Sequence, residues 1–200
     1  MAPAYPPTPA AQWPEEYKPY AEWTDERVAP ALGPNGDVIT YRNANGGLEG
    51  PFPVLIASKD VGQAISESIS KFSSLGNIPK DAKEVAILTV GAKFDAKFEQ
   101  YAHYNIAIKT AGLTHDQCVA MKAGKKPEGL SPAAAATYDA SYHLVNKQGP
   151  LPQGLYDACV KELGKEVTLL MTHYVAMYCY MCVLMNAMRV PLPEGIEMPV

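Results

Sequence analysis

The distribution of proline constrains this chain more than any other feature of its sequence. Ten of the 18 prolines fall within the first 53 residues, whereas the stretch that follows, up to Lys126, contains only one. Proline lacks a backbone N–H and interrupts the interior of helices and strands. The chain therefore divides into an extended, irregular N-terminal arm, residues 1–45, and a regular domain, residues 46–200. The arm holds both tryptophans, Trp13 and Trp23, which predicts that it packs on a protein surface, since free tails are poor in aromatic residues.

The regular domain shows helical patterns throughout. Ser, Thr or Pro stands where most of the segments begin and Gly or Pro where most of them end, as is typical of helix termini. No segment alternates apolar and polar residues over more than a few positions, as a half-buried strand would. We therefore expect an all-α fold, a bundle of about seven helices. The expected helices span about 58–75 (with Gly76 as its stop), 80–93, 96–111, 114–124, 131–147, 153–163 and 166–188.

Two of these segments are apolar on every side. Val85–Val90 and Val167–Met171 have no evident polar face. A helix of this kind lies at the centre of a bundle or at a contact between subunits. Because about seven helices leave little room to cover two such elements, the sequence predicts a homo-oligomer.

Charge and composition exclude several classes of partner. Seventeen basic and 21 acidic residues give a net charge of −4, so we expect neither nucleic-acid binding nor attraction to an anionic membrane. Four cysteines are too few for a disulfide scaffold, and the N-terminus does not resemble a secretory signal. The long apolar stretch 167–188 contains His173 and Asn186, which a bilayer span would disfavour. A soluble, cytoplasmic protein is expected.

Three residues are candidates for acid/base chemistry. Glu99 and His103 are four residues apart and lie on the same face of a helix, which continues into apolar positions. A carboxylate beside an imidazole in apolar surroundings forms an acid/base unit because burial and mutual charge shift both pKa values. The alternative is a surface pair worth a few tenths of a kcal/mol. Glu84 stands in the first turn of its helix, where it stabilises the helix dipole or forms a buried carboxylate among apolar neighbours.

Cys179 and Cys182 form a C-x-x-C pair, which has two possible interpretations. A redox-active pair places its thiolate at a helix N-terminus, where the pKa is lowered. Here the pair lies deep inside an apolar helix, with no basic residue close in sequence. Small core residues are therefore the first interpretation, and thiol chemistry is the alternative.

Five segments together resemble the carboxymuconolactone decarboxylase-like family, which shares the alkylhydroperoxidase-D-like fold. The resemblance covers roughly residues 46–195, and the matching segments occur in the same order. They are GLEGPFPVLI at 47–56, KEVAIL at 83–88, FEQYAH at 98–103, IAIKTAGLT at 106–114 and LMNAMRVPLPEG at 184–195.

The resemblance implies an all-helical domain that assembles as trimers or hexamers. One branch of the family decarboxylates lactone acids without a cofactor, and its E-x-x-x-H pattern matches Glu99 and His103. A second branch is a thiol peroxidase, but its two cysteine positions are occupied here by Ala96 and Glu99. This departure leaves the decarboxylase-like branch. The tryptophan that usually follows the glutamate is replaced by Gln100.

The sequence and the resemblance together predict a cofactor-free lyase that decarboxylates a small or medium organic acid, for example a secondary-metabolite intermediate. His103 would be the general acid/base or the donor to an enolate oxygen, Glu99 would orient it, and Glu84 would shuttle a proton or hold substrate. Two carboxylates would repel an acidic substrate, so either one glutamate is protonated or the repulsion helps to expel CO2.

Three alternatives stay open at this point. The same acid/base site would also serve isomerisation, dehydration or cyclisation. Cys179 and Cys182 would support a thiol oxidoreductase or peroxidase. A helical oligomer that binds without catalysis is the third alternative.

Overall fold

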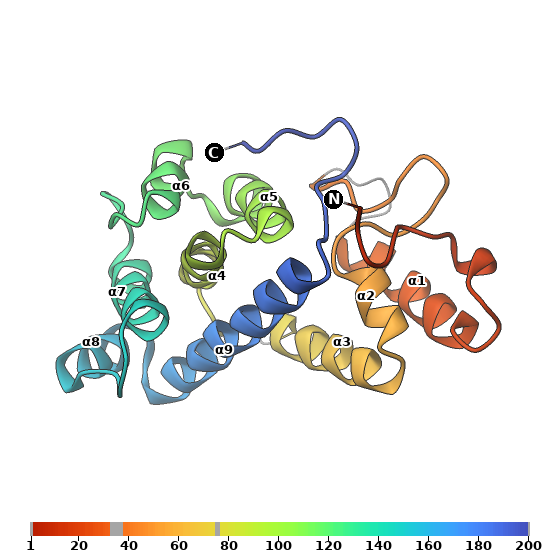
Figure 1. Cartoon of the computed structure of the whole chain (residues 1–200). Coiled ribbons are helices and arrows are strands. Elements are labelled where there is room, and N and C mark those ends of the chain that lie inside the picture. The colour runs from red at the N-terminus through yellow and green to blue at the C-terminus, as the bar shows by residue number, and fades with distance from the viewer. Residues whose placement is uncertain (1, 33–37, 75–76, 200) are drawn as a thin grey trace. The chain divides into compact units, whose positions relative to one another are not determined.

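The computed structural model describes residues 2–32, 38–74 and 77–199, and the described part of the chain is helical without a β-strand. The only bridge between extended residues described there is isolated, between Arg42 and Leu48. The prediction of an all-α fold is therefore confirmed (Figure 1). The α-helices are α1 (Lys18–Leu32), α2 (Phe52–Ala57), α3 (Asp60–Ser73), α4 (Lys80–Phe94), α5 (Lys97–Ile106), α6 (His115–Lys122), α7 (Pro132–Asn146), α8 (Gln153–Leu163) and α9 (Lys165–Ala187).

Contacts divide the chain into two compact units. The first contains residues 1–73 and 184–197, and the second contains residues 74–183 and 198–200. The division expected from the prolines, residues 1–45 and 46–200, follows composition rather than contacts and stays a prediction.

The first unit contains α1, α2 and α3, which contact one another. The expectation of an irregular arm is wrong for α1, which occupies 15 of the 45 residues predicted to be extended. Pro19 falls in the first turn, where the missing N–H costs no hydrogen bond, and the following ten residues contain neither Pro nor Gly. Ala21, Thr24 and Val28 are buried along one face of α1, and this packing supplies the stability that the sequence pattern did not reveal.

The connection between α2 and α3 depends on one glycine. A Cβ added at Gly62 would lie 1.8 Å from the carbonyl oxygen of Leu55, a distance at which atoms overlap. The backbones of α2 and α3 therefore approach each other at a point that no larger residue would allow. The sequence did not predict α2 as a separate helix, because Pro51, Phe52 and Pro53 read as a turn.

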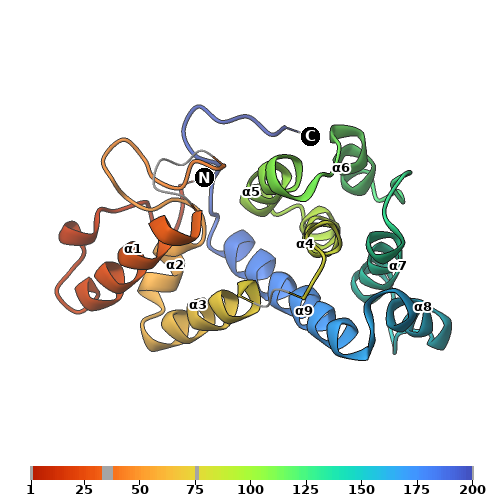
Figure 2. The same cartoon turned by 180° about the vertical axis from the view of Figure 1, so that it is seen from behind.

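The second unit is built around α4. Residues Val85 to Gly91 are all buried, and α4 contacts α5, α6 and α7, between which it lies in both views (Figures 1 and 2). The apolar segment Val85–Val90 is therefore covered by helices of the same chain, which is the first of the two explanations given for it above.

Helix termini in the second unit follow the predicted signals. Thr114 caps α6 in a capping box with Gln117, and Ser131 caps α7 by accepting a hydrogen bond from the N–H of Ala134. The segment predicted at 96–111 is α5 followed by a π-helical turn, Ala107–Ala111, which ends at Gly112. The predicted end of the helix at 75 and its stop at Gly76 lie outside the described residues.

By length and composition, α9 would be able to cross a membrane. Its most apolar 18-residue window has a mean hydropathy of 1.6, and 39% of that window is buried. Core helices of soluble proteins pass the same test, so this composition does not determine where the protein resides.

Candidate active site

The three predicted acid/base residues lie together, although they come from two helices. Glu84 belongs to α4, whereas Glu99 and His103 belong to α5. Nδ1 of His103 lies 2.6 Å from Oε2 of Glu84, and its Nε2 lies 3.3 Å from Oε2 of Glu99. Both ring nitrogens of one imidazole therefore face carboxyl groups.

A close approach of the two helices makes this arrangement possible. A Cβ added at Gly91 of α4 would lie 3.3 Å from Cγ of Gln100 and 3.8 Å from Cβ of Glu99 on α5. The missing side chain lets the start of α5 lie directly against α4. Since Glu99 and His103 are one turn apart, the same contact brings both toward the helix that carries Glu84.

The cluster is largely shielded from solvent. The exposed fraction of the side chain is 1% for Glu84, 7% for Glu99 and 12% for His103. This burial argues against the alternative of a surface ion pair. Of the three groups the imidazole retains the most exposed surface.

Burial and neighbouring charges act in opposite directions on His103. Burial alone lowers the pKa of the imidazole, but the charge and hydrogen bond of Glu84, together with the charge of Glu99, outweigh it. The pKa of His103 is therefore raised above its usual value. The raised pKa favours an imidazolium between the two carboxyl groups.

Glu99 is shifted toward its neutral form. Burial raises the pKa of this carboxyl group, the charge of His103 lowers it, and the charge of Glu84 raises it again, with a net upward shift. The upward shift favours a proton on Glu99, as is common for a buried carboxyl group in an acid/base site.

Tyr178 of α9 completes the cluster, and sequence reasoning did not identify it. Its ring packs edge-on against His103, with the ring centroids 5.0 Å apart and an angle of 89° between the planes, and it stacks on Tyr174. Burial, followed by the charges of Glu99 and Glu84, raises the pKa of the Tyr178 phenol well above its usual value. The phenol therefore stays protonated as an apolar wall with one hydroxyl donor.

Lys83 supplies the nearest compensating positive charge. Its Nζ lies 3.7 Å from Oε1 of Glu84, the oxygen that does not face His103. The side chain is partly exposed, so this contact reaches the edge of the cluster. The only sequence signal for this contact is that Lys83 directly precedes Glu84.

The structure places the C-x-x-C pair beside this cluster but in a form unsuited to thiol chemistry. Cys179 is partly buried and Cys182 is fully buried, and neither forms a disulfide. Burial raises the pKa of both thiols, and for Cys182 the charge of Glu99 adds to it. A reactive thiol needs a lowered pKa, so the pair fits the interpretation as core residues.

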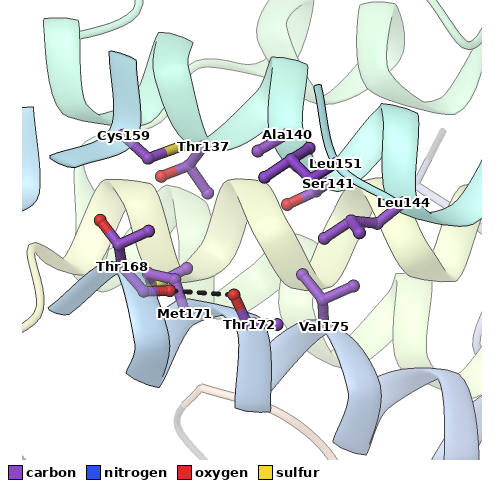
Figure 3. Close-up of a pocket in the computed structure, with 10 residues that line it drawn as sticks. All are labelled: Thr137, Ala140, Ser141, Leu144, Leu151, Cys159, Thr168, Met171, Thr172 and Val175. Atoms are coloured by element: carbon purple, nitrogen blue, oxygen red, sulfur yellow. Dashed lines mark hydrogen bonds between the residues drawn. The ribbon is translucent and has the colours of Figure 1, made fainter. Parts of the chain in front are cut away.

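Other potential sites lie apart from these residues. A cavity of about 20 Å³ between α7, α8 and α9 is lined by none of the cluster residues (Figure 3). Within the described ranges, no group of three or more His, Cys, Asp or Glu side chains is arranged to hold a metal ion.

The comparisons with known proteins give no family assignment. No protein-family model and no curated protein matches the sequence. The similarity to carboxymuconolactone decarboxylase-like proteins therefore remains a resemblance of five short segments.

Proposed function

We propose that this protein is a cofactor-free lyase that decarboxylates a small or medium organic acid at the Glu84–His103–Glu99 cluster. One observation carries the proposal: a single buried imidazole has each ring nitrogen within 3.3 Å of a different buried carboxyl group. An isolated ion pair needs only one such contact. The double contact is suited to holding a proton and delivering it in a fixed direction.

We propose roles for the two glutamates that differ from those expected from the sequence. Glu84 has the shorter contact and orients the ring through Nδ1, a role that the sequence assigned to Glu99. Nε2 and Glu99 then face the reacting group. Tyr178, packed against the ring, restricts its rotation and limits access of water.

The reaction is balanced without a further reactant. The bond between the substrate carboxylate and its α-carbon breaks, CO2 leaves, and the electron pair remains on the α-carbon, delocalised into an adjacent carbonyl. His103 donates its proton to this carbanion or to the enolate oxygen. The proton is then replaced from water, so one carboxylate and one proton yield CO2 and the protonated product.

The charges of the cluster support an acidic substrate. The raised pKa of Glu99 favours its neutral acid, which removes one source of repulsion. Lys83 lies beside Glu84 and offsets its charge. A substrate carboxylate would then meet an imidazolium and a neutral carboxylic acid, which would reduce the repulsion expected from the sequence.

The resemblance to the decarboxylase-like branch also supports this proposal. We propose further that the protein is a homo-oligomer, acts in the cytoplasm and uses a substrate from secondary metabolism. Isomerisation, dehydration or cyclisation at the same site is the second candidate, because the same proton transfers serve these reactions.

CO2 release from a panel of carboxylic acids, including β-keto acids and lactone acids, tests the proposal. We expect turnover by the native protein and a loss of about 10²–10⁴-fold in His103→Gln and Glu99→Gln. His115→Gln and Glu166→Gln, at exposed positions, are the matched controls and should retain activity. Product formation without CO2 would favour the second candidate, and unchanged activity in His103→Gln would refute the site.

One more variant distinguishes the proposed lyase from the thiol oxidoreductase alternative. If the proposal is correct, Cys182→Ser retains the ability to release CO2, and the native protein shows no peroxide turnover. Peroxide turnover that disappears in Cys182→Ser would instead establish the thiol oxidoreductase alternative.

A further inference from the structure

A small cavity in the second unit is lined by hydroxyl groups from two helices. Figure 3 shows the side chains of Thr137 and Ser141 on α7 opposite those of Thr168 and Thr172 on α9. The remaining lining is mostly apolar. A cavity with this mixture differs from a purely apolar void, which stays empty.

Thr137 has an unsatisfied hydroxyl at this cavity. The residue is 2% exposed, and its Oγ1 has no hydrogen-bond partner in the described part of the chain. A buried polar atom left without a partner is unfavourable and, in native proteins, is usually paired with ordered water. The hydroxyl therefore indicates a ligand that can form hydrogen bonds.

On α9, the hydroxyl oxygens of Thr168 and Thr172 can accept hydrogen bonds. Thr168 Oγ1 donates to the carbonyl of Gly164 over 2.8 Å, and Thr172 Oγ1 donates to the carbonyl of Thr168 over 3.0 Å. Each hydroxyl has used its proton and retains lone pairs. A molecule between the helices would thus accept a hydrogen bond from Thr137 and donate hydrogen bonds toward α9.

The volume restricts the ligand to water. The cavity measures about 20 Å³, slightly more than the ~10–15 Å³ that one water molecule requires, whereas an aromatic ring needs a cavity on the order of 150 Å³. A larger pocket of about 460 Å³ shares Thr168 and Thr172 with this cavity but is not lined by Thr137.

We infer that this cavity holds one ordered water molecule, bound to Thr137 Oγ1 and connecting α7 to α9. The inference is independent of the proposed function. The water would link α7 and α9 through hydrogen bonds at the cavity, beside the apolar side chains of Leu144, Met171 and Val175.

Thr137→Val tests the inference because valine has nearly the same shape as threonine but no hydroxyl. In a hydrated cavity the substitution removes an anchor of the water, and we expect a melting temperature lower by about 2–4 °C. In a dry cavity the substitution removes an unsatisfied hydroxyl, and the protein would gain stability. An unchanged or raised melting temperature therefore overturns the inference.

Thr89→Val is the matched control for the loss of a buried hydroxyl. Thr89 is buried on α4, and its Oγ1 already donates to the carbonyl of Val85 over 2.7 Å. We expect both variants to lower the melting temperature, because each would lose a hydrogen bond; a Thr137→Val protein that is stabilised while Thr89→Val is destabilised would contradict the inference.

A high-resolution crystal structure of the native protein gives a second test that does not depend on the folding of a variant. We expect an ordered water within hydrogen-bond distance of Thr137 Oγ1. An empty cavity, or a Thr137 hydroxyl bonded to another protein atom, would overturn the inference.

Discussion

At the scale of single residues, Glu99 links the site to the stability of the protein. Because its pKa is raised in the folded state, the folded protein binds this proton more tightly than the unfolded chain does. The resulting stabilisation is fully present below the unfolded pKa, about 4.3, and is lost as pH rises through the higher folded pKa. At higher pH a buried, ionised Glu99 lowers the free energy of unfolding, whereas a neutral glutamine at this position does not.

We therefore expect Glu99→Gln to gain stability relative to the native protein as pH rises from about 4.3 toward neutral. Urea unfolding at a series of pH values measures this difference. Glu166→Gln, at an exposed position near the start of α9, is the control and should show a much smaller dependence. A difference between Glu99→Gln and the native protein that is constant with pH would contradict the assignment.

The sequence predicted part of this residue-level picture. The four-residue spacing placed Glu99 and His103 on one face of a helix, and the apolar continuation of that face indicated burial. The contact between Glu84 and His103 depends on how α4 packs on α5, which no local pattern specifies. Tyr178 lies 75 residues beyond His103, and one aromatic residue in an apolar helix gives no signal of its position.

At the scale of the helices, we expect alanine at Gly62 and alanine at Gly154 to have opposite effects on stability. Gly62→Ala should destabilise the protein by about 1–3 kcal/mol, because the new Cβ would overlap the carbonyl of Leu55. At Gly154, in the first turn of α8, a Cβ meets no atom within 4 Å. There alanine should stabilise by up to about 0.5–1 kcal/mol.

Chemical denaturation of both variants checks this pair. The comparison controls for the general preference of helices for alanine, which is the same at both positions. A Gly62→Ala protein as stable as Gly154→Ala would show that α2 and α3 do not approach each other as closely as described.

Helices with strong terminal signals were the easiest to predict. For α8, Pro152 before it and Gly164 after it gave both bounds correctly. For α1, prolines near the ends of the segment suggested an irregular chain. Its helical interior became evident only from the burial of one face, which requires knowledge of α2 and α3.

At the scale of the whole molecule, the prediction of a homo-oligomer now depends on fewer features. The apolar segment of α4 is covered within the chain, so it no longer requires a neighbouring subunit. On α9, however, Leu169 is 60% exposed and Val183 is 52% exposed. These exposed apolar side chains on α9 still favour association.

Light scattering coupled to size-exclusion chromatography measures the mass in solution directly. The resemblance predicts a trimer or a hexamer of the 200-residue chain. A monomer at all concentrations would remove the oligomer from the account and would leave the acid/base cluster unaffected, since all of its members belong to one chain.

The central claim is that two carboxyl groups hold His103 as one coupled acid/base unit, and NMR titration of the histidine ring tests it most directly. The chain has four histidines, so the spectrum of His103→Gln assigns the signal. We predict a pKa for His103 above 6.5, lowered in Glu84→Gln because the neutral amide no longer stabilises the imidazolium. A His103 pKa at or below 6.5 that does not respond to Glu84→Gln would contradict the account.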